Sequence, residues 1–176
     1  RIEEGLAAGV VRMTTHIARN PTRIFPAVVD ELADKYGDAP ALLSDRECFS
    51  YRALAARSNR YARWALAQGI GKGDTVCLLM PNRPEFLALW LGVTRGGGVV
   101  ALLNTNLTGP ALAYCINVVT PKHIVVAAEL LGSLQTAQPH ITGNAKPWLH
   151  GNANAGYARL DREIETFSGD TLADSE

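Results

Sequence analysis

Polar side chains occupy two loops that each follow an apolar run of strand length. Asn82 stands in the first loop, and Asn104, Asn106 and Thr108 stand in the second. A side-chain amide both donates and accepts hydrogen bonds, as recognition of an amide, ribose or phosphate edge requires. Each loop also opens a helix, whose free backbone N–H groups attract anions. We therefore predict ligand binding at Asn82, Asn104, Asn106 and Thr108, although Asn and Thr also cap helices and stabilise turns.

Other stretches resemble chemical motifs but stand in the wrong order along the chain. Residues 96–98 are glycines that follow a helical pattern and precede a strand, the reverse of a phosphate-binding loop. Residues 69–73 are also glycine-rich, yet no strand precedes them, so we interpret them as a turn. Glu85 opens a helical pattern, and we expect it to be a first-turn helix residue rather than a base.

Cysteine and histidine spacing excludes the usual metal and nucleophile arrangements. The cysteines, Cys48, Cys77 and Cys115, are odd in number and far apart, which argues against a disulfide framework and a zinc site and favours a reducing cytosol. No Ser-His-Asp or Cys-His arrangement can be argued. We therefore predict no catalytic and no metal-binding residue, and we expect the histidines to lie on the surface or in packing: His16, His123, His140 and His150.

Three apolar runs, at 75–80, 99–103 and 123–127, alternate with helical patterns along the middle of the chain. Continuous apolar strands between helices indicate a layered, mainly parallel sheet with helices on both faces, joined by right-handed crossovers. Parallel neighbours end at the same edge, so the loops that hold Asn82 and Asn104 should lie near each other beyond the carboxyl ends. The predicted fold class is therefore α/β.

The N-terminal region adds smaller elements to this sheet. Residues 1–24 carry apolar side chains at helical spacing, with arginines in the later half, and are typical of an amphipathic helix. Such a helix either packs on the protein's own surface or lays its basic face on a membrane. Residues 26–36 predict a second helix, and 41–50 predict a short β-hairpin whose last residue, Ser50, can cap the next helix.

The C-terminal region gives a weaker signal. Residues 146–150 could form one more strand, and 157–167 could form a charged helix. The polar and acidic residues 168–176 are expected to be loose. They resemble an arbitrary end, so we expect 25–176 to be an incomplete part of a larger domain.

Composition excludes several classes of partner. Lys and Arg together number 17, as do Asp and Glu, so no net field favours nucleic acid. No run approaches the roughly 18 apolar residues that a membrane span requires, and no export signal is recognisable. A cytoplasmic protein is expected, either free or at the inner face of a membrane through residues 1–23.

Four stretches in order carry a resemblance to a known family: 49–54 (FSYRAL), 71–76 (GKGDTV), 80–86 (MPNRPEF) and 101–107 (ALLNTNL). The chain resembles the N-terminal part of an adenylate-forming, AMP-binding acyl-CoA synthetase. It is most similar to the branch of long- and very-long-chain fatty-acyl-CoA synthetases and fatty-acid transport proteins. The resemblance is firm from about residue 25 to residue 127.

The resemblance implies a parent enzyme that joins a fatty acid to ATP, giving an acyl-adenylate and pyrophosphate, and then passes the acyl group to coenzyme A, with Mg²⁺ assisting. No stretch of this chain matches the family's phosphate loop, its acidic residue for the ribose or its catalytic lysine. The likeness places only Asn82, Asn104, Asn106 and Thr108 on the nucleotide or pantetheine side of the cleft. ATP, Mg²⁺ and coenzyme A are therefore expected for the parent, and none of them is expected to bind this chain tightly.

Two hypotheses follow for this chain. The first is a fragment of a fatty-acid–CoA ligase that is inactive alone and self-associates through apolar surface that the rest of its domain would cover. The alternative is a non-catalytic binding or scaffold module with the same fold.

Overall fold

The computed structural model describes residues 24–45, 47–154 and 156–173. The amphipathic helix predicted at the N-terminus falls on residues 1–23, outside the described residues, so its packing and its membrane contact stay predictions. Within the described part of the chain, no helix has the length and apolar character needed to cross a lipid bilayer.

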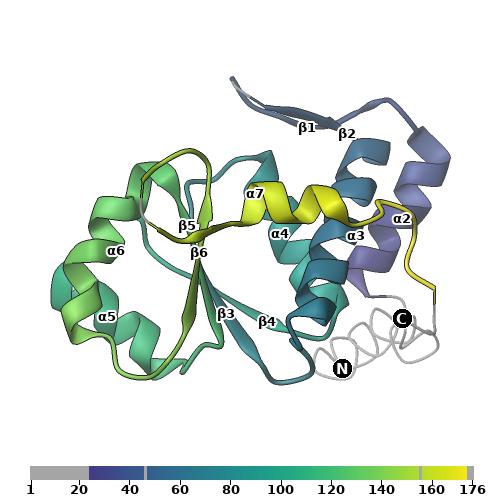
Figure 1. Ribbon diagram of the computed structural model, residues 1–176. Coiled ribbons are helices and arrows are strands. Elements are labelled where there is room, and N and C mark those ends of the chain that lie inside the picture. The colour runs from purple at the N-terminus through teal and green to yellow at the C-terminus, as the bar shows by residue number, and fades with distance from the viewer. Residues whose placement is uncertain (1–23, 46, 155, 174–176) are drawn as a thin grey trace, which may run out of the picture.

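A five-stranded sheet forms the centre of the molecule (Figure 1). All its strand pairs are parallel, in the order β4, β3, β5, β6, β7, and Val76 of β3 lies between Val100 of β4 and His123 of β5. The predicted parallel arrangement of the three apolar runs is confirmed, and the extra strand predicted at 146–150 is present. The strands are β3 Thr75–Leu79, β4 Val99–Leu102, β5 His123–Ala127, β6 Lys146–His150 and β7 Ala158–Arg159.

Helices cover both faces of this sheet, as Figure 1 shows. Alternate residues of β3 enter two separate cores, with Val76 and Leu78 on one side and Cys77 and Leu79 on the other. Helices α2, α3 and α4 build the first core, and α5 and α6 build the second. The bounds are α2 Phe25–Tyr36, α3 Tyr51–Ala67, α4 Pro84–Arg95, α5 Gly109–Val118 and α6 Leu131–Ala137, with short 3-10 helices η1 Ala128–Leu130 and η2 Gln138–His140.

Helix α3 is held at its start and packs closely on α4. As predicted, Ser50 caps α3, since its hydroxyl accepts a 3.1 Å hydrogen bond from the backbone N–H of Ala53. Gly92 of α4 lies at the crossing, where an added Cβ would stand 2.4 Å from Cβ of Tyr61 and 2.5 Å from the carbonyl oxygen of Ser58. The crossing therefore requires glycine at this position.

The predicted hairpin is also present, as a separate antiparallel pair beside the start of α3. It consists of β1 Pro40–Leu43 and β2 Cys48–Ser50. Its turn brings Glu47 towards the start of α4, where the backbone N–H of Glu85 donates to a Glu47 carboxylate oxygen at 3.2 Å.

The C-terminal region differs from the prediction in two ways. The helix predicted at 157–167 begins only at α7, Leu160–Glu163, and continues as η3, Ile164–Thr166, because Ala158 first pairs with Trp148 as part of β7. The looseness expected from residue 168 onwards is wrong for its first residues. Arg63 of α3 donates to the carbonyl oxygens of Ser168 and Asp170, at 2.9 and 2.6 Å, and so holds the segment on α3.

Candidate functional site

A pocket of about 350 Å³ opens at the carboxyl edge of the sheet, where β3 leads into α4. Its walls come from the hairpin turn, the β3–α4 loop and η1, which are three segments far apart in the sequence. The pocket therefore stands where ligands bind in open parallel sheets. It is lined by Ser44, Asp45, Glu47, Pro81, Asn82, Arg83 and Glu129.

Arg83 joins the walls of this pocket. It is the extended residue just before α4, and Pro84 at the first helical position favours that geometry. Its Nη1 donates to Glu129 at 2.9 Å, its Nη2 donates to Nδ1 of His150 at 3.0 Å, and its Nε lies 3.5 Å from a carboxylate oxygen of Glu47. One guanidinium thus connects η1, the end of β6 and the hairpin turn.

Glu85 follows Arg83 by two residues in the chain and is 4% exposed. Its carboxylate accepts hydrogen bonds from Nε of Arg57, at 2.8 Å, and from the hydroxyl of Tyr61, both on α3. Nε2 of His150 lies 3.3 Å from the same oxygen. Because Arg83 can only donate, Nδ1 of a neutral His150 accepts its bond, and the ring proton on Nε2 then points towards Glu85.

These partners decide the ionisation of the buried groups. Burial opposes the charge on Glu85, but the hydrogen bonds from His150 and Tyr61 and the charge of Arg57 outweigh it and lower the pKa of Glu85. Burial and the neighbouring carboxylate raise the pKa of Tyr61, so its hydroxyl keeps its proton. Burial likewise opposes the charge of Arg57, yet Glu85 and Glu165 raise its pKa. Glu85 is therefore an ionised carboxylate with charged and hydrogen-bonding partners, and it is not arranged as a general base.

The predicted site residues are divided between two places. Asn82 lines the pocket, as a ligand-binding residue would. Asn104 instead accepts a 2.9 Å hydrogen bond from the backbone N–H of Asn106, which is the turn-stabilising role. Thr108 precedes α5 without a side-chain cap, and the next N–H, that of Gly109, donates to Thr136 of α6. Ligand binding at these four residues stays a prediction.

The sequence interpretation missed the buried network around Glu85. Glu85 is a first-turn residue of α4, as expected, but it shares the buried face of that helix with Ala88, Leu89 and Gly92. A charged residue at helical spacing among buried apolar ones signals a buried partner. Similarly, His150 ends the apolar strand β6, and it does more than pack, since it contacts two charged side chains.

Phosphate chemistry does not fit the described lining of the pocket. Three carboxylates, Asp45, Glu47 and Glu129, face the single guanidinium of Arg83, which already contacts two of them. No group of three or more His, Cys, Asp or Glu side chains in residues 24–45, 47–154 and 156–173 is arranged to hold a metal ion. The positive charge of Arg83 at the pocket is thus already balanced by carboxylates.

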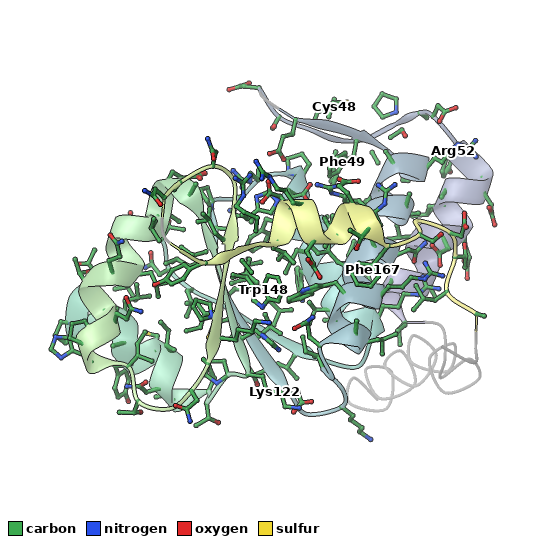
Figure 2. All side chains as sticks on the ribbon, viewed as in Figure 1. Cys48, Phe49, Arg52, Lys122, Trp148 and Phe167 are labelled. Carbon is green, nitrogen blue, oxygen red and sulfur yellow. The ribbon has the colours of Figure 1, made fainter. Side chains whose placement is uncertain are left out.

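Lysines stand at the opposite edge of the sheet. Nζ of Lys122, just before β5, lies 2.7 Å from a carboxylate oxygen of Asp74 and 3.1 Å from the carbonyl oxygen of Gly69. Figure 2 shows Lys122 at the bottom of the view and the hairpin residues Cys48 and Phe49 at the top. Lys122 is therefore too remote to serve the pocket.

Comparison with known proteins identifies this arrangement. The sequence model of the AMP-binding enzyme family matches residues 29–167. The chain belongs to the AMP-binding enzyme family. Over 129 residues it is 37% identical to human long-chain fatty acid transport protein 6. This match covers 72% of this chain but only 21% of that relative. The chain thus spans about a fifth of the length of that relative.

Two solved structures share the fold. An anthranilate CoA ligase in complex with anthranoyl-AMP superposes with a TM-score of 0.77 at 16% identity, covering 84% of this chain and 29% of that one. A fatty acyl CoA synthetase from Mycobacterium tuberculosis gives a TM-score of 0.73 at 25% identity, again covering 84% of this chain and 29% of that one. The resemblance to adenylate-forming acyl-CoA synthetases is confirmed, as is the layered α/β fold.

Proposed function

We propose that this chain is part of a fatty-acid–CoA ligase. In the first step, a carboxylate oxygen of a long-chain fatty acid bonds to the α-phosphorus of ATP, and pyrophosphate leaves. In the second, the thiol of coenzyme A attacks the acyl carbon, and AMP leaves. The match of the AMP-binding enzyme family to residues 29–167 carries this proposal. The similarity to a long-chain fatty acid transport protein favours a fatty acid as the activated substrate.

The chain's own contribution is a framework that positions the loop of Asn82. Arg83 and Pro84 adjoin this residue, and Arg83 ties the loop to three other elements. A side-chain amide that lines a pocket can accept from a ribose hydroxyl, or donate to and accept from the amides of pantetheine. Asn82 is therefore our first candidate for contact with nucleotide or coenzyme A, ahead of Asn104, Asn106 and Thr108.

The same framework does not perform adenylation by itself. Stabilising the charge that develops on the α-phosphate needs preorganised donors, which usually supply the largest catalytic contribution. Arg83 is held by Glu129, Glu47 and His150, and Lys122 pairs with Asp74 at the far edge. Tight binding of ATP or Mg²⁺ to residues 1–176 alone is accordingly not expected.

Pyrophosphate exchange tests this proposal. The natural protein that contains residues 1–176 is assayed with ATP, Mg²⁺ and a long-chain fatty acid, beside the 176-residue polypeptide alone. We expect fatty-acid-dependent exchange and acyl-CoA formation from the natural protein, and background from the polypeptide. Lack of both activities in a folded natural protein would reject the ligase function. Exchange by the repurified polypeptide would show that it holds a complete site.

A matched pair of asparagine variants tests the role of Asn82. In the natural protein, Asn82→Ala should raise KM for ATP or coenzyme A about tenfold, the effect of losing roughly one hydrogen bond of 1.4 kcal/mol. Asn144→Ala, an exposed asparagine in the loop before β6, should leave KM unchanged. Equal kinetics for both variants would remove Asn82 from the binding site.

A further inference from the structure

One edge of the central sheet is open and apolar. Among the described residues, β4 pairs with β3 on one side only, so it forms the end of the sheet. Two large apolar side chains of β4 are exposed, Val99 and Leu102, and we call residues Val99–Leu102 the β4 edge.

The β4 edge lacks the features that keep sheet edges apart. Natural edge strands are protected by charged side chains, proline, bulges or a covering segment. Residues 96–121 contain no Asp, Glu, Lys, Arg or His, although 19% of the whole chain is charged. The pairing of β4 with β3 also runs without a register shift. An unprotected apolar edge of this kind is a template for pairing with another strand.

The backbone of β4 leaves two residues ready to pair. The N–H of Val99 donates to the carbonyl oxygen of Asp74 at 2.8 Å, and that of Leu103 donates to Leu78 at 3.0 Å. Alternate residues of a strand direct their backbone groups to the same side, so Val100 and Leu102 direct theirs to the open side. These are the groups that an added strand would bind.

We infer that two copies of this chain pair through their β4 edges. The strands run antiparallel about a twofold axis at Ala101, so Val100 of one copy exchanges both backbone hydrogen bonds with Leu102 of the second copy. This contact is isologous and closes at a dimer.

The charge pattern favours a second copy as the occupant. An uncharged edge needs an uncharged partner, because a buried unpaired charge is costly. A second copy supplies such an edge, and the chain's formal net charge of zero adds no repulsion between copies. A lipid surface fits less well, because the open N–H and C=O groups of Val100 and Leu102 would have no partners in hydrocarbon.

Sedimentation velocity and hydrogen exchange of the 176-residue polypeptide test this dimer. We expect a dimer that dissociates on dilution. At low concentration the backbone amides of Val100 and Leu102 should lose protection against hydrogen exchange, and the other amides of the sheet should keep theirs. Leu102→Lys and Val99→Lys, at the two exposed apolar residues of β4, should each weaken dimerisation at least about tenfold, because lysine protects edges and is costly to bury. Leu43→Lys, at an apolar hairpin residue that is 72% exposed, is the matched control and should leave the dimer intact.

Three outcomes would overturn the inference. A monomer with exchanging β4 amides would show that the edge stays free. A monomer with protected β4 amides would show that another segment of the same chain covers the edge. A dimer that persists in both folded lysine variants would assemble through another surface. None of these readouts depends on ligase activity, so failure here is distinguishable from failure of the proposed function.

Discussion

Two buried histidines stand at opposite ends of the sheet in contrasting surroundings. His150, at the carboxyl end of β6, contacts the charged side chains of Arg83 and Glu85. His123, at the amino end of β5, contacts the indole of Trp148, whose Nε1 donates to Nδ1 of His123 at 3.1 Å. Trp64 of α3 completes this aromatic cluster, with its ring centre 5.8 Å from that of His123. Figure 2 shows Trp148 in the interior, between the sheet and α3.

At each end of the sheet, burial disfavours the charged form of an ionisable side chain, but the outcome differs. At the carboxyl end, opposite charges and hydrogen bonds compensate for burial, and the pKa of Glu85 is lowered because its charged form is the one that has partners. At the amino end, burial followed by the charge of Lys146 lowers the pKa of His123, so its neutral form is favoured. One end thus holds a buried charge that has partners, whereas at the other end the buried histidine is favoured in its neutral form.

The strongest test of this contrast removes the central charge. Glu85→Gln leaves the largely buried Arg57 with the half-exposed Glu165 as its one remaining anionic partner among the described residues. Breaking a buried pair by removing one member usually costs 3–5 kcal/mol, and we expect about 3 kcal/mol here. Chemical denaturation measures the loss. The matched control is Glu165→Gln on the same arginine, which should cost less than about 1 kcal/mol because that carboxylate is half exposed. Equal losses would show that the buried network contributes no special stability.

A smaller effect should come from the helix that serves both ends. Tyr61 reaches the charged network and Trp64 reaches the aromatic cluster, and both belong to α3. Gly92→Ala would push α3 away from α4 and should destabilise the fold by about 1–3 kcal/mol, as overpacking does. Gly132→Ala is the control, since Gly132 lies in α6 with open space around it and alanine there should stabilise by up to about 1 kcal/mol. Thermal unfolding of both variants decides whether close approach matters.

The order of elements could be predicted because the buried strands are continuous apolar runs. The run from Val76 to Leu79 is fully buried, so its pattern directly indicated a strand covered on both faces. The C-terminal region was harder because its structure depends on distant partners. Ala158 and Arg159 form a strand only through β6, and the carbonyl oxygens at 168 and 170 are held by Arg63. The local sequence pattern reveals neither the pairing with β6 nor the hydrogen bonds from Arg63.

The candidate site could be predicted only where position along a strand decided it. Asn82 follows β3, so strand topology alone was enough to place it at the carboxyl edge. The network of Glu85 needed side-chain geometry, because Arg57 and His150 are 28 and 65 residues away from it in the chain. Spacing in the sequence does not show such pairs, although the buried position of Glu85 on the apolar face of α4 was a usable signal.

The smallest expected effect is on the pH dependence of folding stability, which differs between the two ends of the sheet. The folded-state pKa of His123 lies below its ordinary value of 6.5, so the unfolded chain takes up a proton first as the pH falls. Stability should therefore decline from about pH 6.5 down to the lowered pKa, by about 1.4 kcal/mol for each pH unit between the two values, and then level off for this group. The lowered pKa of Glu85 acts in a different window: its contribution is present above its ordinary value of 4.5 and is lost as the pH falls through the folded-state pKa.

Urea denaturation across this pH range isolates the contribution of His123 when a variant of this buried histidine is compared with a variant of an exposed one. His123→Gln keeps an acceptor for Trp148 but cannot titrate, so the decline that begins near pH 6.5 should become shallower while the loss below pH 4.5 persists. His140→Gln changes an exposed residue and should retain the full decline. Lys146 and Lys122 disfavour the protonated ring and Asp74 favours it. Lys146→Gln should therefore raise the folded-state pKa of His123 towards 6.5, which narrows the first window from its low-pH end and reduces the decline. If His123→Gln and the unaltered chain lost stability in parallel from pH 6.5, the aromatic end would not be stabilised by excluding charge, and the contrast between the two histidines would fail.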